Sequence, residues 1–194
     1  MTKRKLFIPV LLGTSRQGRE SEKVAKLIYD HISKSPEIET QLFDPRVMHL
    51  PQDDEDGGIK EQNKEWKDAI IRADGLIIVT PEYNHAFPGS LKRALDLLLP
   101  EYIHKAVGLV GVSAGGWGGV RAVEHLVQVV RELGLAVTFS DLYFPKVQDA
   151  FDDQGKPKDE KVYKRIDDFM TELIWMAKAL KWGRENLPSK YHKK

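Results

Sequence analysis

Cysteine is absent from the 194-residue sequence, and its absence excludes three kinds of chemistry. The chain cannot form a disulfide, use a thiolate as a nucleophile or bind a metal ion through cysteine. The six histidines lie singly along the chain, and none belongs to a metal-ligand motif such as HExxH, so we predict no metal site. A lack of disulfides is typical of a reducing compartment, and we therefore expect a cytoplasmic protein.

Long hydrophobic runs and an excess of charge of one sign are missing as well. No apolar run approaches the ~20 residues that a membrane-spanning helix needs. A basic start precedes a short apolar run at residues 6–12 that lacks a small-residue cleavage site, so we expect a first strand rather than a signal peptide. The 30 basic and 29 acidic residues leave a net charge of +1, which predicts no strong attraction to nucleic acid or to a membrane surface.

What the sequence does contain is a regular alternation of apolar runs and amphipathic segments. The runs are continuously apolar, as expected for parallel strands covered on both faces; they lie at residues 6–12, 75–80 and 106–113, with weaker candidates at 38–43 and 136–139. Between and after them, apolar side chains recur at helical spacing. This alternation predicts an α/β fold, namely a flavodoxin-like, three-layer α/β/α sandwich around a five-stranded parallel sheet in the order 2-1-3-4-5.

We expect the chain to form a single domain over residues 1–194, with polar segments between its elements. Residues 52–58 (QDDEDGG) and 151–157 (FDDQGKP) are polar loops that precede helices. The last helical stripe ends at Leu180. The segment that follows is rich in basic residues and also contains glycine and proline. We therefore expect residues 181–194 (KWGRENLPSKYHKK) to form a solvated tail rather than a binding arm.

Ligands of an open α/β sheet bind beyond the carboxyl ends of its strands, near the point where the strand order reverses. In the predicted order that point lies between the first and third strands. The loops after the first, third and fourth strands therefore form the candidate site. We name them the first loop (residues 13–21), the second loop (81–89) and the third loop (111–119).

The first loop, GTSRQGRES, combines hydroxyl groups, two arginines and the start of a helix, a set that suits a phosphate. It lacks the Gly-Lys-Ser/Thr of a P-loop and the G-x-G-x-x-G of a dinucleotide site, so a monophosphate is expected. In the alternative interpretation, Ser21 is an ordinary N-cap, and Arg16 and Arg19 are solvated.

The second loop, PEYNHAFPG, places aromatic, amide and proline residues directly after a buried strand. Its backbone and the side chains of Tyr83 and Asn84 suit a flat ring. The alternative is a stiff structural loop in which Pro88 begins a helix. His85 is a candidate general base, although a single loop histidine is more often a polar surface residue.

The third loop, GVSAGGWGG, has two interpretations. It contains G-x-S-x-G, the nucleophile elbow of α/β-hydrolases, which makes Ser113 a candidate nucleophile. A hydrolase also needs an acid and then a histidine downstream, and neither His125 nor His192 fits that order. In the alternative, Gly115 and Gly116 let backbone donors approach a ring, and Ser113 adds a hydroxyl. A flat ring, one phosphate and no metal together describe flavin mononucleotide (FMN).

These loops resemble those of the flavodoxin-like NAD(P)H-dependent FMN reductases, a family that includes quinone, azo-dye and chromate reductases. The first loop is similar to the family's G-[ST]-x-R phosphate loop, residues 80–96 are similar to its TPEYN…PG.LKNA.D signature, and residues 112–116 are similar to its third flavin loop. The resemblance covers residues 5–150. It implies bound FMN, NAD(P)H as electron donor, and a small acceptor such as a quinone, free flavin, azo compound or metal oxyanion.

The resemblance also implies which residues bind the cofactor, with the flavin rather than a side chain carrying the chemistry. The first loop is expected to hold the phosphate, and Arg19, where many relatives have a small hydroxyl residue, to tighten that grip. The second loop is expected to line the isoalloxazine and ribityl, and the third to contact the pyrimidine side. The implied binding residues are Thr14, Ser15, Arg16, Arg19, Ser21, Pro81, Glu82, Tyr83, Asn84, Ser113, Gly115 and Gly116.

Two other functions stay open at this point: an FMN-binding redox sensor or electron carrier with little turnover, and a serine hydrolase that uses Ser113. The near-neutral charge argues against a dedicated carrier, because flavodoxins are strongly acidic. The family resemblance further implies a homodimer or homotetramer, and no preference between NADH and NADPH is predicted. Four aromatic residues are candidates either for a subunit contact or for the core: Trp66, Phe87, Tyr102 and Trp117.

Overall fold

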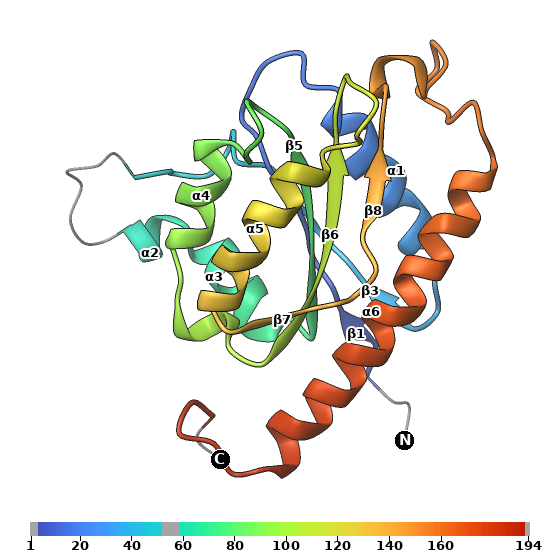
Figure 1. Ribbon diagram of the computed structural model, residues 1–194. Coiled ribbons are helices and arrows are strands. Elements are labelled where there is room, and N and C mark those ends of the chain that lie inside the picture. The colour runs from blue at the N-terminus through green and yellow to red at the C-terminus, as the bar shows by residue number, and fades with distance from the viewer. Residues whose placement is uncertain (1–3, 52–58, 193–194) are drawn as a thin grey trace.

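Parallel strands form the centre of the molecule, and helices cover them (Figure 1). The computed structural model describes residues 4–51 and 59–192, so the predicted loop at 52–58 lies outside the described residues. The strands are β1 (Leu6–Phe7), β2 (Val10–Leu12), β3 (Ile38–Glu39), β4 (Leu42–Phe43), β5 (Gly75–Pro81), β6 (Lys105–Val112), β7 (Leu135–Val137) and β8 (Leu142–Phe144). The helices are α1 (Ser21–Ile32), α2 (Ile59–Gln62), α3 (Lys64–Arg72), α4 (Gly89–Asp96), α5 (Val120–Glu132) and α6 (Lys161–Asn186), with short 3-10 helices η1 (Pro100–Tyr102) and η2 (Val147–Asp149).

The strand order of the sheet confirms the prediction. The main sheet runs β4-β2-β5-β6-β7, and each neighbouring pair is parallel. This is the order 2-1-3-4-5 when the strands are numbered as the sequence predicted them. Every residue of β5 and β6 is buried, as expected for central parallel strands covered on both faces.

Two of the five predicted strands are each divided into two, and a further strand, β8, follows the last predicted one, which corrects the predicted strand count. The first predicted strand yields β1 and β2, and the second yields β3 and β4. Strands β1 and β3 form a separate two-stranded ladder, and the main sheet has six strands. Pro9 interrupts the first strand because its nitrogen carries no hydrogen. Thr40 Oγ1 donates a 2.7 Å hydrogen bond to the Ile8 carbonyl, which keeps the first and second predicted strands adjacent at the break.

The last strand reaches further than predicted. Phe139, which the sequence placed in this strand, is 86% exposed. The chain leaves the sheet after the Thr138 amide, which donates a 3.0 Å hydrogen bond to the Val107 carbonyl, and it returns as β8 beside the end of β6. The three residues of β8 are too short a run for periodicity to reveal.

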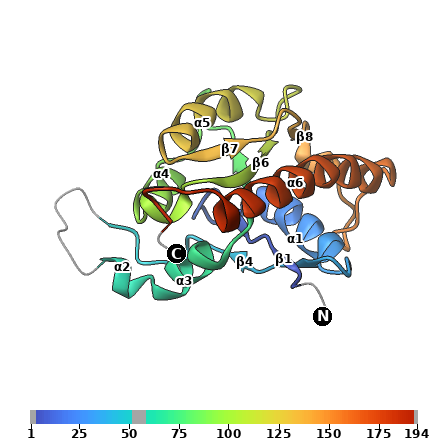
Figure 2. The ribbon, with the colours of Figure 1, turned by 90° about the horizontal axis from the view of Figure 1, so that it is seen from below.

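The helices form two layers on opposite faces of the sheet (Figure 2). The apolar sides of α1 and α6 belong to one core cluster, and those of α3, α4 and α5 belong to the other. Trp66 and Tyr102 lie in the second cluster and are buried, whereas Trp117 is 69% exposed. In the described part of the chain, no helix is both long enough and apolar enough to cross a membrane.

Helix α6 is longer than predicted, because residues 181–186 of the expected tail are helical. Arg184 explains the extension: its guanidinium donates to the buried Asp74 carboxylate at 3.1 Å and to the His104 carbonyl at 2.7 Å. Lys181 lies 3.6 Å from the same carboxylate. The apolar stripe ends at Leu180, so hydrophobic periodicity alone could not reveal this polar attachment.

Candidate functional site

The three loops emerge together at the carboxyl end of the central strands (Figure 1). The first loop lies close to β5, because the Gly13 amide donates a 2.7 Å hydrogen bond to the Val79 carbonyl. Thr14 Oγ1 and the Tyr83 hydroxyl are 3.2 Å apart, and the Ser15 amide donates to Ser90 Oγ at 3.4 Å. The structure therefore brings the first and second loops into direct contact, as the sheet order required.

A buried hydroxyl without a partner lies at the start of α1. Glu20, rather than Ser21, occupies the N-cap position, and it makes no side-chain capping bond. Ser21 begins the helix, and its buried Oγ has no hydrogen-bond partner among the residues that the structure describes. An unpartnered buried hydroxyl costs about 1–3 kcal/mol, so this group fits a site where a ligand oxygen completes it. The interpretation of Ser21 as an ordinary N-cap does not agree with this geometry.

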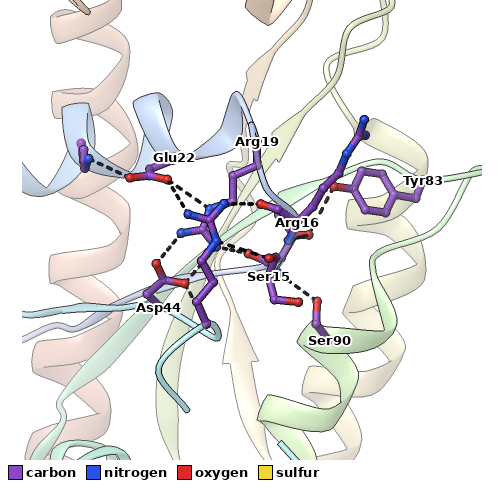
Figure 3. Close-up of polar contacts among 10 residues, drawn as sticks. Ser15, Arg16, Arg19, Glu22, Asp44, Tyr83 and Ser90 are labelled. Atoms are coloured by element: carbon purple, nitrogen blue, oxygen red, sulfur yellow. Dashed lines mark hydrogen bonds and ion pairs between the residues drawn. The ribbon is translucent and has the colours of Figure 1, made fainter. Parts of the chain in front are cut away.

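Arg19 points into the protein rather than toward solvent (Figure 3). Its Nη1 donates to the Thr14 carbonyl and to Asp44 Oδ1, Nη2 pairs with Asp44 Oδ2, and Nε lies 3.3 Å from Glu22 Oε2. Burial raises the pKa of Asp44, but hydrogen bonds from Arg19 and from the Arg46 amide outweigh it, so the net pKa lies below its usual value. The donors of Arg19 are thus directed at protein acceptors.

The second loop contains a turn in an unusual backbone conformation. Asn84 and His85 have φ values of +50° and +67°, a left-handed region that non-glycine residues rarely adopt. Hydrogen bonds of 2.8 and 3.0 Å between the backbones of Tyr83 and Ala86 close the turn. Backbone strain of this kind persists where the surroundings hold it and is common in binding sites.

Arg121, on α5, fixes this turn from the side. Its guanidinium pairs with Glu82 Oε1, at 2.9 Å from Nε and 2.7 Å from Nη2, and its Nη1 donates to His85 Nε2 at 2.8 Å. Because a guanidinium only donates, Nε2 is the acceptor and the neutral imidazole carries its proton on Nδ1. The Glu82 side chain is 8% exposed, and its Oε2 has no hydrogen-bond partner among residues 4–51 and 59–192. His85 is therefore bound to Arg121, which does not favour a role as a free general base.

The third loop directs the Ser113 hydroxyl to its own backbone. Ser113 Oγ donates a 2.9 Å hydrogen bond to the Gly115 carbonyl. The described non-glycine residues with positive φ do not include Ser113, so the strained turn of a nucleophile elbow is not present there. Gly115 and Gly116 are exposed and have no atom within 4 Å of the position of a Cβ, so the side of each residue where a side chain would lie is open.

Four contact residues escaped the sequence analysis: Asp44, Arg46, Ser90 and Arg121. Two of them follow β4, the neighbour of β2, so they lie at the same edge of the sheet as the first loop. A charged pair directly after the second predicted strand was the available signal. Within residues 4–51 and 59–192, no group of three or more histidine or acidic side chains could hold a metal ion.

Known proteins share this sequence and fold. A family model described as NADPH-dependent FMN reductase matches residues 7–149. The NADPH azoreductase of Bacillus sp. (strain OY1-2) is 37% identical over 120 residues, which span 60% of this chain and 64% of that protein, less than two thirds of its length. The FMN-dependent NADPH-azoreductase of Staphylococcus aureus (strain USA300) is 34% identical over 136 residues, with coverage of 66% and 71%.

Among solved structures, the flavoenzyme FerB of Paracoccus denitrificans, an NAD(P)H:(acceptor) oxidoreductase, has a TM-score of 0.75 and 23% identity; the alignment covers 89% of this chain and 98% of FerB. This likeness defines the class of fold as flavodoxin-like. The chain belongs to the family of NADPH-dependent FMN reductases, whose model matches well over half of its residues. At the level of that family, the predictions of an NAD(P)H-dependent oxidoreductase and of FMN as its cofactor are confirmed.

Proposed function

We propose that the protein binds FMN across its three loops, reduces it with NAD(P)H and passes the electrons to a small acceptor such as an azo compound or a quinone. The family model and the two azoreductase relatives support this reaction. The structural observation that carries the proposal is the buried, unpartnered hydroxyl of Ser21 at the start of α1. A phosphate oxygen at this helix N-terminus would complete it.

The proposed phosphate ligands are Thr14, Ser15, Arg16 and Ser21. Ser15 and Arg16 are exposed, so their side chains are accessible from solvent. The start of α1 adds the positive end of the helix dipole. Arg19 is not among these ligands, because Thr14, Glu22 and Asp44 already accept its hydrogen bonds.

Bound FMN would supply the redox chemistry, namely transfer of a hydride's two electrons from a nicotinamide to an acceptor. The second loop would line the ring and ribityl through residues 81–84, whose turn is already held by Arg121. The third loop would present the open backbone of Gly115 and Gly116 to the pyrimidine side. The protein binds and orients the reactants, and no side chain is assigned a catalytic role.

The remaining sequence-based alternatives receive less support. The Ser113 hydroxyl donates a hydrogen bond to the Gly115 carbonyl, and no observation favours the serine hydrolase. A redox sensor or electron carrier would use the same FMN site, so turnover rather than binding separates it from a reductase. In steady state with NADPH and a quinone, a reductase consumes many equivalents of NADPH for each protein molecule.

The absorption spectrum of the purified protein tests the cofactor. We expect a flavin spectrum that survives gel filtration, bleaches on addition of NADPH or NADH under nitrogen, and returns when an azo dye or quinone is added. A protein that is colourless and fails to bind added FMN in a fluorescence titration would refute the proposal. Bleaching with negligible steady-state turnover would instead support the sensor or carrier.

The proposed enzyme acts in the cytoplasm as a homodimer or homotetramer. Of the aromatic residues considered for a subunit contact, Trp117 is the most exposed, and it lies in the third loop beside the proposed flavin site. Light scattering of the purified protein measures the oligomeric state. A monomer at micromolar concentration would contradict this part of the proposal.

A further inference from the structure

Three consecutive backbone carbonyls of the first loop each accept a hydrogen bond from an arginine. Arg19 Nη1 donates to the Thr14 carbonyl. Arg46 Nε donates to the Ser15 carbonyl at 3.3 Å, and its Nη2 donates to the Arg16 carbonyl. Arg46 follows β4, so one arginine comes from the loop itself and the other from the neighbouring strand. The carbonyl oxygens of the loop are therefore held by two side chains.

Holding the carbonyls also orients the amides. In a planar trans peptide the C=O of one residue and the N–H of the next point in opposite directions. Carbonyls held at residues 14–16 consequently turn the amides of residues 15–17 to the opposite side of the loop. Two of these amides already meet hydroxyl oxygens: that of Ser15 donates to Ser90 Oγ at 3.4 Å, and that of Arg16 donates to Thr14 Oγ1 at 3.2 Å. Successive amides with a common direction form an anion-binding concavity.

The two arginines are in turn held by two carboxylates. Asp44 pairs with Arg19 and accepts a 2.9 Å hydrogen bond from the Arg46 amide. Glu22 Oε2 lies 3.3 Å from Arg19 Nε and 3.5 Å from Arg46 Nη1. Figure 3 shows Arg19 between Glu22 and Asp44 on one side of the loop, with Tyr83 and Ser90 on the other. Two positive charges thus face two negative charges, so the pair of arginines contributes geometry rather than net charge.

We propose that Arg19 and Arg46 are positioning residues, which fix the carbonyl side of the first loop so that its amide side binds the FMN phosphate. This inference rests on the proposed function. It differs from the expectation that Arg19 grips the phosphate with its own charge. A lysine at position 19 would keep that charge, but it lacks the planar fork that reaches Asp44 and the Thr14 carbonyl together.

The affinities for FMN and for riboflavin, measured by flavin fluorescence quenching, test this role, because riboflavin lacks the phosphate. We expect Arg19→Lys and Arg46→Gln each to reduce the preference for FMN about tenfold, since hydrogen bonds from charged groups orient the amides. The affinity for riboflavin should stay within about twofold, because the ring contacts are untouched. Arg131→Gln, an exposed arginine in the last turn of α5, is the matched control and should change neither affinity.

Hydrogen exchange gives a second readout that does not depend on activity. FMN should protect the amides of residues 15–17 in the unmodified protein, and this protection should be weaker in both variants. If Arg19→Lys fails to fold because its site is buried, Arg46→Gln decides the question, since the Arg46 side chain is 34% exposed.

Two outcomes would overturn the inference: an unchanged preference for FMN in Arg46→Gln, or an Arg19→Lys variant that keeps the preference while Arg19→Gln loses it. The second outcome would show that charge, rather than the fork, matters. Failure of the proposed function would look different from failure of this inference. In that case the unmodified protein would bind neither FMN nor riboflavin, or it would bind both without preferring FMN.

Discussion

The two ends of the sheet differ in how the polar groups that we describe there are paired. At the amino end, the Asp74 carboxylate is 1% exposed and accepts hydrogen bonds from the Phe7 amide and from Arg4 and Arg184. The buried Lys105 ammonium donates to the last carbonyls of α3. We call the side chains of Arg4, Asp74, Lys105 and Arg184 the amino-end latch. Each of its charged groups has a partner within the protein.

At the carboxyl end, two buried oxygens have no hydrogen-bond partner among the described residues, namely Ser21 Oγ and Glu82 Oε2. The second loop also holds two left-handed non-glycine residues. Native proteins pair nearly all of their buried polar groups, and these two oxygens lie where the three loops meet, so they fit a site that a ligand completes. Substitutions at the amino end should therefore change stability, whereas substitutions at the carboxyl end should change binding.

Removal of the central carboxylate of the latch, in Asp74→Ala, should produce the largest loss of stability. It leaves the Phe7 amide without its acceptor and the Arg184 guanidinium without its anionic partner. Breaking a buried ion pair in this way costs about 3–5 kcal/mol. Arg4 is half exposed, so we expect a loss near the lower value, measured by urea denaturation. The contrast between the two ends would fail if Asp74→Ala weakened FMN binding in the folded protein while leaving the free energy of unfolding within about 1 kcal/mol.

A side chain at Gly13 should affect both stability and binding. A Cβ there would lie 2.8 Å from the Val79 carbonyl oxygen and 2.9 Å from Thr80 Cα, so the first loop must move away from the end of β5, where the second loop begins. We expect Gly13→Ala to cost about 2–3 kcal/mol and to weaken FMN binding, because the loops would separate.

The matched control for Gly13→Ala is Gly18→Ala, which has open space around it but a φ of +63°. Its backbone strain should cost only about 1 kcal/mol. Thermal unfolding of both variants without flavin compares them, and equal losses would show that close approach at Gly13 is not what holds the loops together.

Ser21→Ala should separate binding from stability with opposite signs. Because Ser21 Oγ is buried without a partner, its removal should raise the free energy of unfolding without flavin by up to about 1 kcal/mol. The affinity for FMN should fall about tenfold, because one phosphate hydrogen bond is lost. Denaturation without flavin and a fluorescence titration measure the two effects. A variant that is destabilised without flavin would mean that Ser21 has a structural partner.

Lys105 should make stability depend weakly on pH. Burial lowers its pKa to about 7, whereas an unfolded lysine keeps its usual value near 10.5. Between these values the unfolded chain binds more protons than the folded one, so the free energy of unfolding rises with pH. The slope stays below the ~1.4 kcal/mol per pH unit that one proton allows. Lys105→Met should flatten this rise in urea denaturation between pH 7 and 10, and equal slopes in both proteins would contradict the assignment.

The elements that were predictable have local signals. β5 and β6 are continuous apolar runs, and both are buried throughout. The loops that follow them are contiguous in the sequence, so their composition could be interpreted directly once the strand order was predicted. The same holds for the first loop, whose contact with the second follows from the adjacency of β2 and β5.

The features that were not predictable depend on pairs of distant residues. Arg19 belongs to the first loop, but its direction is decided by Asp44, 25 residues later. The end of α6 depends on Asp74, which lies 110 residues before Arg184. Periodicity is measured over windows of about 11–18 residues, which are too short to contain both members of either pair. A pattern of charge or hydrophobicity therefore cannot reveal which acceptor a guanidinium will meet.

Asp74 also has a consequence for the order in which the protein folds. Arg4 precedes it by 70 residues and Arg184 follows it by 110, so the latch joins the first strand, the centre of the sheet and the last helix. Contacts over such separations form slowly compared with helices and turns. During synthesis the final turns of α6 must leave the ribosome before the latch can close. We therefore expect the nascent chain to acquire its full stability only after the end of α6 has emerged from the ribosome.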